Sequence, residues 1–361
     1  MKNIKRLLAV LTVICLVFTF TACHKKGEAA VKVGDLTFSS GYYACAFFFA
    51  DSEARSKVEE QLTADGEDTT DVDYAKHEID GKKYADYVKE EALNSIKKIA
   101  AAKIYCKNNK LTLGDDEQQI ELYAEYYWEN GYSDVLVKNG VSKETYIEYM
   151  KDASYESVYF DNVFGSEGEK AVSEDALKEE LSKNYALADM IDVDFTDLDD
   201  EEKTAKTEQL NTYLTELSKG KRSFEDIYHE YNGTEAGADE TTESEDDSET
   251  AKPLDDHATL IGNSETSVAN DYFDEIHAME NGSVKIIDKA DDAGKILVLK
   301  KDVLADPYYL TNYDSTLRHA IADEDFEKVV EDFLKTLKFT EYTSATGAFT
   351  VKKVYYPETT S

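Results

Sequence analysis

The sequence predicts an α+β fold: a mostly helical N-terminal domain, completed by a C-terminal helix, with a small α/β domain inserted between them. Apolar residues recur at spacings of three and four through most of 40–185 and again over 323–337, which is typical of amphipathic helices. Between these segments, apolar and polar residues alternate over 190–195, which indicates a strand. Two helical segments therefore flank a mixed one.

The first 22 residues (1–22) are predicted to be a secretory signal. Basic residues precede an apolar run from Leu7 to Phe20, and two small residues lead to Cys23. The run is shorter than the roughly 20 residues that span a bilayer, which disfavours a permanent transmembrane anchor. A cysteine at this place resembles the bacterial lipobox, whose thiol takes a diacylglycerol; the alternative is a plain signal with an incidental cysteine. We predict lipidation at Cys23, a tether over 23–30, and a place on the extracytoplasmic side of the cell membrane, of the Gram-positive type.

The composition excludes some classes of function. The chain has 76 acidic and 40 basic residues and a formal net charge of −36, so it repels phosphate backbones and lacks the basic stripe that nucleic-acid binding needs. No nucleic-acid partner is therefore expected. The 42% hydrophobic content, with 25 tyrosines, is enough to build real cores.

The four cysteines do not form a disulfide framework. Cys15 leaves with the signal and Cys23 is lipidated, which leaves Cys45 and Cys106. Both lie among apolar neighbours, which favours two small buried thiols, although the two could also pair with each other.

Residues 31–172 are predicted to form the helical domain. Its two clearest helices each carry an apolar face, and we expect these faces to pack against each other. The expected elements are a strand at Val31–Phe38 with a turn at Gly34 and Asp35, a helix that begins at Ser39 or Ser40, and helices at Tyr84–Cys106, Asp115–Trp128 and Ser142–Phe164.

Residues 173–303 are predicted to form the small α/β domain. Its stretch 233–252 is rich in acids and has no apolar residue beyond alanine, so we expect a disordered loop there. The loop lacks the ligand spacing of an EF-hand, which disfavours a calcium site. The other expected elements are a strand at 190–195, helices at Glu201–Lys219, after Ser223 and at Ala269–Met279, a turn at Asn281-Gly282, and strands at Val284–Ile287 and Lys295–Lys300.

Residues 304–361 are predicted to pack on the N-terminal domain. An amphipathic helix at Asp323–Leu337 needs burial that its own neighbours in the sequence cannot give. Strands are expected at Phe349–Tyr356.

The order of these elements resembles a known family. The stretch Tyr84–Asn108, followed by Leu111–Asp116, resembles the N-terminal domain of the PrsA/SurA-like foldases, which are extracytoplasmic chaperones with parvulin-type peptidyl-prolyl isomerase domains. Most of the mature chain takes part in the resemblance, which implies a chaperone-type helical domain and a parvulin-like inserted domain. The stretches similar to a parvulin domain are Val172-Ser173-Glu174, Ser223–Ile227, Tyr272–Gly282 and Val284–Val298.

The chain departs from the family at the catalytic positions. Ile191-Asp192-Val193 stands where the first active-site histidine is expected, and Gly294–Leu297 replaces the run that carries the second. Isomerisation needs a hydrogen-bonded polar network around the prolyl bond, so the resemblance implies a degenerate catalytic centre. Asp192 and Asp194 are the candidates for a rearranged polar set.

The peptide-binding half of a parvulin site has candidates in this chain. Tyr272, Phe273 and Met279 supply aromatic and flexible apolar surface, and the alternative is that they are ordinary core. Motifs of other enzyme classes are missing from the sequence, and its histidines have no ligand spacing, so we expect no metal and no cofactor. The six histidines are His24, His77, His229, His257, His277 and His319.

We therefore expect a membrane-anchored foldase or chaperone whose partners are unfolded or nascent exported polypeptides. Two alternatives stay open. One is an active peptidyl-prolyl isomerase, and the other is a non-catalytic surface lipoprotein for ligand binding or assembly, because a fold alone does not fix a function. The sequence sets no oligomeric state.

Overall fold

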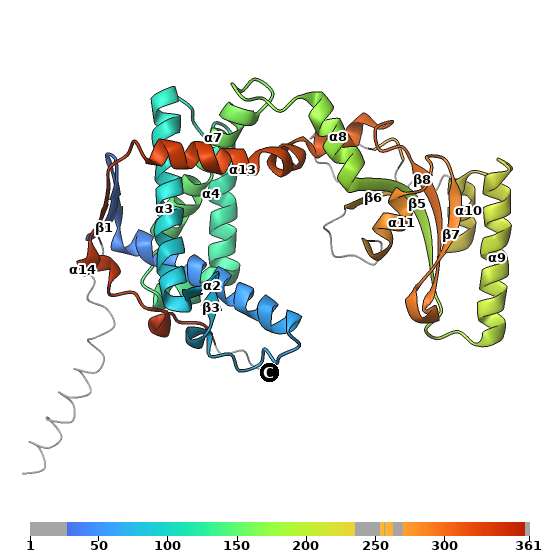
Figure 1. Ribbon diagram of the computed structural model, residues 1–361, viewed down its shortest axis with the longest axis horizontal. Coiled ribbons are helices and arrows are strands. Elements are labelled where there is room, and N and C mark those ends of the chain that lie inside the picture. Colours follow the sequence, from blue (N-terminus) through green and yellow to red (C-terminus); the bar gives the residue numbers. More distant parts are fainter. Residues whose placement is uncertain (1–26, 235–252, 256, 263–269, 358–361) are drawn as a thin grey trace, which may run out of the picture. The chain divides into compact units, whose positions relative to one another are not determined.

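A computed structural model describes residues 27–234, 253–255, 257–262 and 270–357. The chain divides into two compact units: unit 1 consists of Met1–Lys170 and Glu324–Ser361, and unit 2 of Ala171–Asp323. Both units combine helices with small antiparallel sheets, so the predicted α+β class is confirmed (Figure 1). The predicted signal, Cys23 and nearly all of the acidic loop lie outside the described residues.

Unit 1 is built around two long helices, α2 and α3, that pack against each other. Ser39 caps the N-terminus of α2, and its hydroxyl accepts a hydrogen bond from the Tyr42 backbone N–H at 3.2 Å. Within the described residues, no helix combines the length and the hydropathy needed to cross a bilayer. The described helices of unit 1 include α2 (Ser40–Ala64), α3 (Tyr84–Asn109), α4 (Asp116–Tyr127), α5 (Ser133–Lys138), α6 (Lys143–Ala153), α7 (Tyr155–Phe164) and α14 (Thr343–Thr346).

The main sheet of unit 1 joins its two ends. β1 (Ala29–Val33) lies between β2 (Leu36–Ser39) and β9 (Phe339–Glu341), and both neighbours run antiparallel to it. The predicted strand at Val31–Phe38 is thus a hairpin, and its turn contains Gly34 at φ +57°. A Cβ at Gly34 would lie 2.9 Å from Ile104 of α3, so the turn suits glycine in both backbone conformation and space. A second, short hairpin pairs β3 (Glu78–Ile79) with β4 (Lys82–Lys83).

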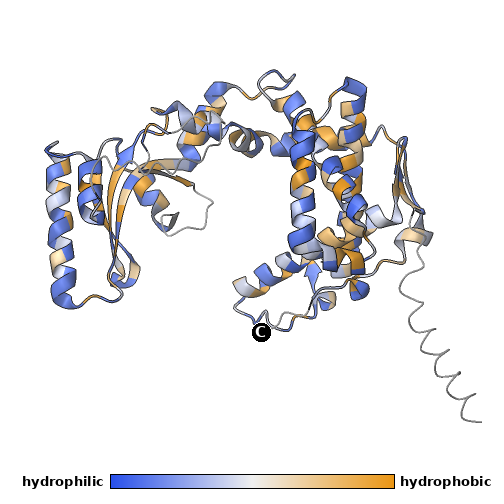
Figure 2. Cartoon of the chain, turned by 180° about the vertical axis from the view of Figure 1, so that it is seen from behind, coloured by the Kyte–Doolittle hydropathy of each residue, from blue (hydrophilic) through white to orange (hydrophobic). Residues whose placement is uncertain are grey.

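The core of unit 1 is rich in aromatic residues. Tyr42, Tyr43, Phe47 and Tyr84 are buried together with Val31 and Val33 of the sheet. Hydrophobic residues gather where the helices of this unit face one another (Figure 2). A tyrosine can fill a core while its hydroxyl reaches a polar partner, as Tyr42 does with Asp152 at 3.3 Å and Tyr84 with Asp51 at 3.0 Å, whereas the Tyr43 hydroxyl has no partner among the described residues.

The helix α13 (Asp314–Leu334) crosses the boundary between the units in the sequence. Its Phe326 is buried against the rings of Tyr159 and Phe160 on α7, at centroid distances of 5.2 and 5.3 Å. The expected burial of the C-terminal helix on the N-terminal helices thus occurs through this second part of α13.

The strands expected at Phe349–Tyr356 are wrong. This stretch holds a 3₁₀ turn at Val351–Lys353, and β9 at Phe339–Glu341 takes the free edge of β1 instead. The alternating apolar residues pack through their side chains. Phe349 contacts the ring of Tyr43 at 5.5 Å, and Tyr356 stacks on Phe48 at 5.4 Å.

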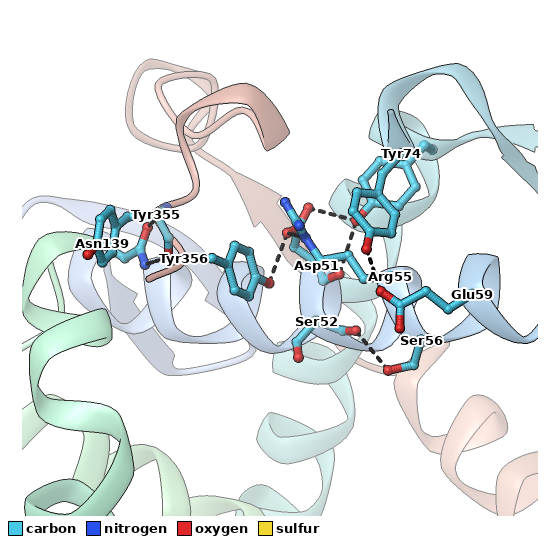
Figure 3. A network of polar contacts seen from close by, with 10 residues as sticks. Asp51, Ser52, Arg55, Ser56, Glu59, Tyr74, Asn139, Tyr355 and Tyr356 are labelled. Atoms are coloured by element: carbon cyan, nitrogen blue, oxygen red, sulfur yellow. Dashed lines mark hydrogen bonds and ion pairs between the residues drawn. The ribbon is translucent and has the colours of Figure 1, made fainter. Parts of the chain in front are cut away.

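The C-terminal stretch is held by a buried carboxylate on α2 (Figure 3). Asp51 accepts hydrogen bonds from the hydroxyls of Tyr84 and Tyr356, each at 3.0 Å, and pairs with the Arg55 guanidinium at 2.9 Å. That guanidinium lies 4.0 Å from the centre of the Tyr356 ring. The backbone of Tyr355 also exchanges two hydrogen bonds with the Asn139 side chain, at 2.8 and 2.9 Å.

Unit 2 is a four-stranded antiparallel sheet in the order β6-β5-β8-β7 with helices on both faces. Ile191 and Val193 of β5 face the core beneath α9 and α10, whereas Ala186 and Ala188 face the core beneath α11. The elements of unit 2 are α8 (Glu174–Asn184), β5 (Tyr185–Asp194), α9 (Asp200–Ser218), α10 (Phe224–Asn232), β6 (Ala258–Gly262), α11 (Phe273–His277), β7 (Val284–Asp288), β8 (Gly294–Lys301) and α12 (Pro307–Asn312), followed by the first part of α13.

The second boundary of unit 2 differs from the one predicted at residue 303. Tyr309 of α12 and Leu317 of α13 are buried in one cluster with Leu177 and Leu181 of α8. Arg318 also donates a hydrogen bond to the carbonyl of Val172 at 2.9 Å. Residues 304–323 therefore belong to unit 2, because the apolar surface of α8 is covered by them.

Both remaining cysteines are free and buried, so the pairing considered from the sequence is not formed. Burial raises the pKa of the Cys106 thiol to about 11 and raises that of Cys45 as well. At pH 8 only about one thousandth of the Cys106 thiol is then ionised, and the thiolate is the reactive form. We expect both thiols to resist iodoacetamide in the native protein and to react within minutes in urea, as measured by mass spectrometry. Rapid labelling of either cysteine in the native protein would contradict this.

Candidate functional site

The helix α4 turns its charged side toward its neighbour α6. Lys151 of α6 forms ion pairs with Glu117 at 2.7 Å and with Glu121 at 3.3 Å. Lys143 reaches Glu125 in the same way, at 3.3 Å. Ala124 is the buried residue of α4. The contact between these helices therefore consists of ion pairs around one small apolar side chain.

The opposite side of α4 is apolar and faces solvent. Each of its residues has another three or four positions away, so they share one side of the helix. This is the reverse of an ordinary surface helix, whose apolar stripe faces the core. We call this surface the tyrosine face, and it comprises Leu122, Tyr123, Tyr126 and Tyr127, which are 58%, 56%, 60% and 52% exposed.

The end of α4 is firmly anchored. A π-helical turn at Trp128–Tyr132 follows the helix, and the Trp128 ring is buried 5.6 Å from that of Tyr146. The buried Trp128 ring therefore fixes the position of the helix that carries the tyrosine face. Turns of this kind are frequent near functional sites.

Tyrosine suits the binding of varied peptides. Its ring offers apolar area, its hydroxyl can donate and accept hydrogen bonds, and it has few rotatable bonds to fix on binding. On α4 the Tyr123 hydroxyl accepts a hydrogen bond from Gln119 at 3.2 Å, and the rings of Tyr126 and Tyr127 meet edge to face at 5.6 Å. The surface can thus cover an apolar segment and satisfy polar groups at its border.

Unit 1 also has a shallow apolar groove of about 370 Å³ between α3, the end of α13 and β9. The Lys97 ammonium lies 4.7 Å from the centre of the Phe339 ring at its border. Such a groove can take one or two apolar side chains. Its lining residues are Val33, Asn94, Lys97, Glu331, Leu334, Lys335, Leu337 and Phe339.

The structure brings the three predicted peptide-binding residues of unit 2 together on one face of the sheet. Phe273 is buried in the core beneath α11, and Tyr272 and Met279 are half-buried against the same core. The Tyr272 hydroxyl accepts a hydrogen bond from the Ala290 backbone N–H at 3.3 Å. Phe273 thus contributes to folding, and Tyr272 and Met279 retain exposed surface.

The two predicted acids lie at the end of β5 that pairs with the first residues of β8. Asp192 pairs with Lys289 at 2.5 Å. Asp194 accepts hydrogen bonds from the Thr196 hydroxyl at 2.5 Å and its backbone N–H at 2.8 Å, and these bonds hold the pKa of Asp194 below its usual value. Each carboxylate therefore has a local structural partner, and a lowered pKa makes Asp194 a weak base.

The tyrosine face was missed in the sequence, although a signal for it exists. Glu117, Glu121 and Glu125 recur every four residues, which places the acids on one side of the helix and the aromatic residues on the other. The presence of Lys143 and Lys151 on α6 favours the acidic side as the one that faces α6.

Comparisons with known proteins give similar solved structures but no match by sequence. No family model matches the sequence, and no curated protein matches it. Among solved structures, the chain is similar to foldase protein PrsA from Streptococcus pneumoniae, with 12% identity, a TM-score of 0.38, and coverage of 68% of this chain and 84% of that one. It is likewise similar to foldase protein PrsA from Lactococcus lactis, with 12% identity, a TM-score of 0.38, and coverage of 91% and 100%.

Proposed function

We propose that this protein is a foldase or chaperone that acts outside the cytoplasmic membrane, is anchored by a lipid on Cys23, and binds unfolded or nascent exported polypeptides. The tyrosine face is the observation that carries this proposal. Four large side chains of α4 are more than half exposed although the fold does not need them there. An exposed apolar surface of this kind is typical of an interaction site.

The physical basis of client binding is the removal of apolar surface from water. Each ring that a client covers contributes on the order of 1–2 kcal/mol, so a few contacts give modest and reversible affinity. The net charge of −36 keeps the protein soluble and attracts basic stretches of unfolded chains. Binding through a surface without deep pockets also fits many sequences, as a general chaperone requires.

We infer that unit 2 is a parvulin-like domain without isomerase activity. On its candidate face, Asp192 and Asp194 are engaged by Lys289 and Thr196. His277 is engaged as well: its ring stacks on Phe273 at 5.0 Å, and its Nε2 lies 2.8 Å from the carbonyl oxygen of Ser182. A free proton-transferring set is therefore not supported on this face among the described residues.

Aggregation of an unfolded model protein tests the role of the tyrosine face. We expect the wild type to suppress light scattering by the client, and the double variant Tyr123→Ser with Tyr126→Ser to lose this activity at least about fivefold, because two of the exposed rings are removed. The matched control is Leu304→Ser with Tyr342→Ser, which removes exposed apolar side chains elsewhere. Equal activity of both double variants would contradict the assignment, provided circular dichroism shows that both are folded.

Isomerisation of a proline-containing peptide tests the other half of the proposal. We expect the wild type to leave the rate at its uncatalysed value. Acceleration that Asp192→Asn or Asp194→Asn abolishes would show instead that unit 2 is an active isomerase with a rearranged polar set.

A further inference from the structure

Two histidines and a glutamate of unit 2 bring their donor atoms together. Glu225 and His229 lie one turn apart on α10, and His257 directly precedes β6. One oxygen or nitrogen from each residue lies within 4.8 Å of the others. We propose that these three side chains form a binding site for a divalent transition-metal ion of the zinc class.

The surroundings orient the first imidazole toward such an ion. The Nδ1 atom of His229 lies 2.8 Å from the Thr234 hydroxyl, which leaves Nε2 free to point toward Glu225, whose carboxylate oxygen is 4.0 Å away. Metal-binding histidines characteristically give their second nitrogen to such a partner, which fixes the tautomer. Thr234 would therefore hold the His229 ring in the orientation that metal binding requires.

The second imidazole is held by stacking. The His257 ring lies on the Tyr228 ring at 4.4 Å and stands almost perpendicular to the His229 ring, at an angle of 86°. The backbone N–H of His257 donates to Asp255 at 2.9 Å, and Asp255 in turn pairs with Lys301 of β8. The position of His257 is thus set by the sheet as well as by α10.

The donor set indicates the class of metal. Two imidazole nitrogens and one carboxylate oxygen suit Zn²⁺, Cu²⁺ and Ni²⁺ better than Ca²⁺ or Mg²⁺, which prefer oxygen alone. Bonds of about 2.0–2.1 Å require donors about 3.4 Å apart, so the side chains need only small rotations to close on an ion. Three protein ligands would leave a fourth position for water.

Such an ion would join parts of the chain that are far apart in the sequence. Glu225 and His229 belong to a helix over one face of the sheet, and His257 leads into β6 at the sheet edge. A bound ion would cross-link α10 to this edge strand across a long connection in the sequence. A cross-link that closes a long loop lowers the entropy of the unfolded chain more than one that closes a short loop. The site would therefore stabilise unit 2.

Calorimetric titration of the purified protein with ZnCl₂ tests the proposal. We expect one equivalent of Zn²⁺ to bind at least about a hundredfold more tightly than the weak binding by surface acids, and His229→Gln and His257→Gln each to weaken it at least about tenfold. The matched control His319→Gln changes an exposed histidine that pairs with Asp323 on α13, and it should leave the titration unchanged.

A spectroscopic readout separates binding at this site from loss of folding. With Co²⁺, the wild type should show the visible absorption of a tetrahedral nitrogen and oxygen site, and Glu225→Gln should shift that spectrum while the metal-free protein keeps the wild-type melting temperature. Zinc binding that is weak throughout, or that is equal in His229→Gln, His257→Gln and His319→Gln, would overturn the proposal.

Discussion

Replacement of Asp51 by alanine is expected to lower the free energy of unfolding of unit 1 by about 3–5 kcal/mol. The Asp51 side chain is fully buried, and its carboxylate binds Arg55, Tyr84 and Tyr356. Its removal leaves the partly buried Arg55 guanidinium and the Tyr356 hydroxyl without their carboxylate partner, and unpaired buried polar groups are costly. The Tyr84 hydroxyl keeps the backbone carbonyl of residue 51 as an acceptor, at 3.1 Å. The C-terminal stretch also loses its attachment to α2.

Chemical denaturation followed by tryptophan fluorescence measures this change in unit 1 by itself. Trp128 is the single tryptophan of the chain and lies in the core of unit 1. The control is Glu53→Ala on the same helix, whose exposed carboxylate pairs with Lys57 at 3.1 Å and should cost less than about 0.5 kcal/mol. Tyr356→Phe removes one hydrogen bond and should cost about 1 kcal/mol. If Asp51→Ala were no more costly than Glu53→Ala, the carboxylate would not hold the C-terminal stretch.

Replacement of Phe326 by alanine is expected to cost about 3–5 kcal/mol in the same measurement. The ring is 5% exposed and meets Tyr159 and Phe160 edge to face. Its truncation leaves a cavity between α13 and α7 and removes three edge-to-face aromatic contacts, the third of them with Phe164 at 6.4 Å. The N-terminal helices would then lose the burial that the C-terminal helix gives them.

The matched control for Phe326 is the same truncation at an exposed site. Phe339 is 39% exposed on β9, and Phe339→Ala should cost less than half as much. A similar loss at the two positions would mean that the contact of α13 with α7 contributes little to unit 1.

The sequence predicts most elements because their signals are local. The helix expected after Ser223 is α10, and the Ser223 hydroxyl caps it by accepting a hydrogen bond from the Asp226 N–H at 3.1 Å. The predicted helix from Glu201 to Lys219 is α9 within one residue at each end. Caps and periodicity act within a few residues of the chain, so the sequence carries them directly.

The sequence does not predict pairing between distant segments. No local sequence signal predicts that β9 pairs with β1. The alternation of apolar residues over Phe349–Tyr356 predicts a strand, but in the structure these side chains pack against α2. The candidate sites follow the same rule. The tyrosine face depends on lysines of another helix, and the approach of His257 to His229 depends on the sheet.

The pairing of β1 with β9 has a consequence for how the chain acquires its structure. A ribosome makes the first strand long before its partner, Phe339–Glu341, exists. Phe326 and Tyr356, which binds Asp51, also come late in the chain, whereas all of unit 2 lies in the sequence between the two parts of unit 1. Unit 2 can therefore fold while the first helices of unit 1 still lack their packing partners, which lie in the last tenth of the chain. During that interval the nascent protein exposes the same kind of apolar surface that we propose it recognises in others.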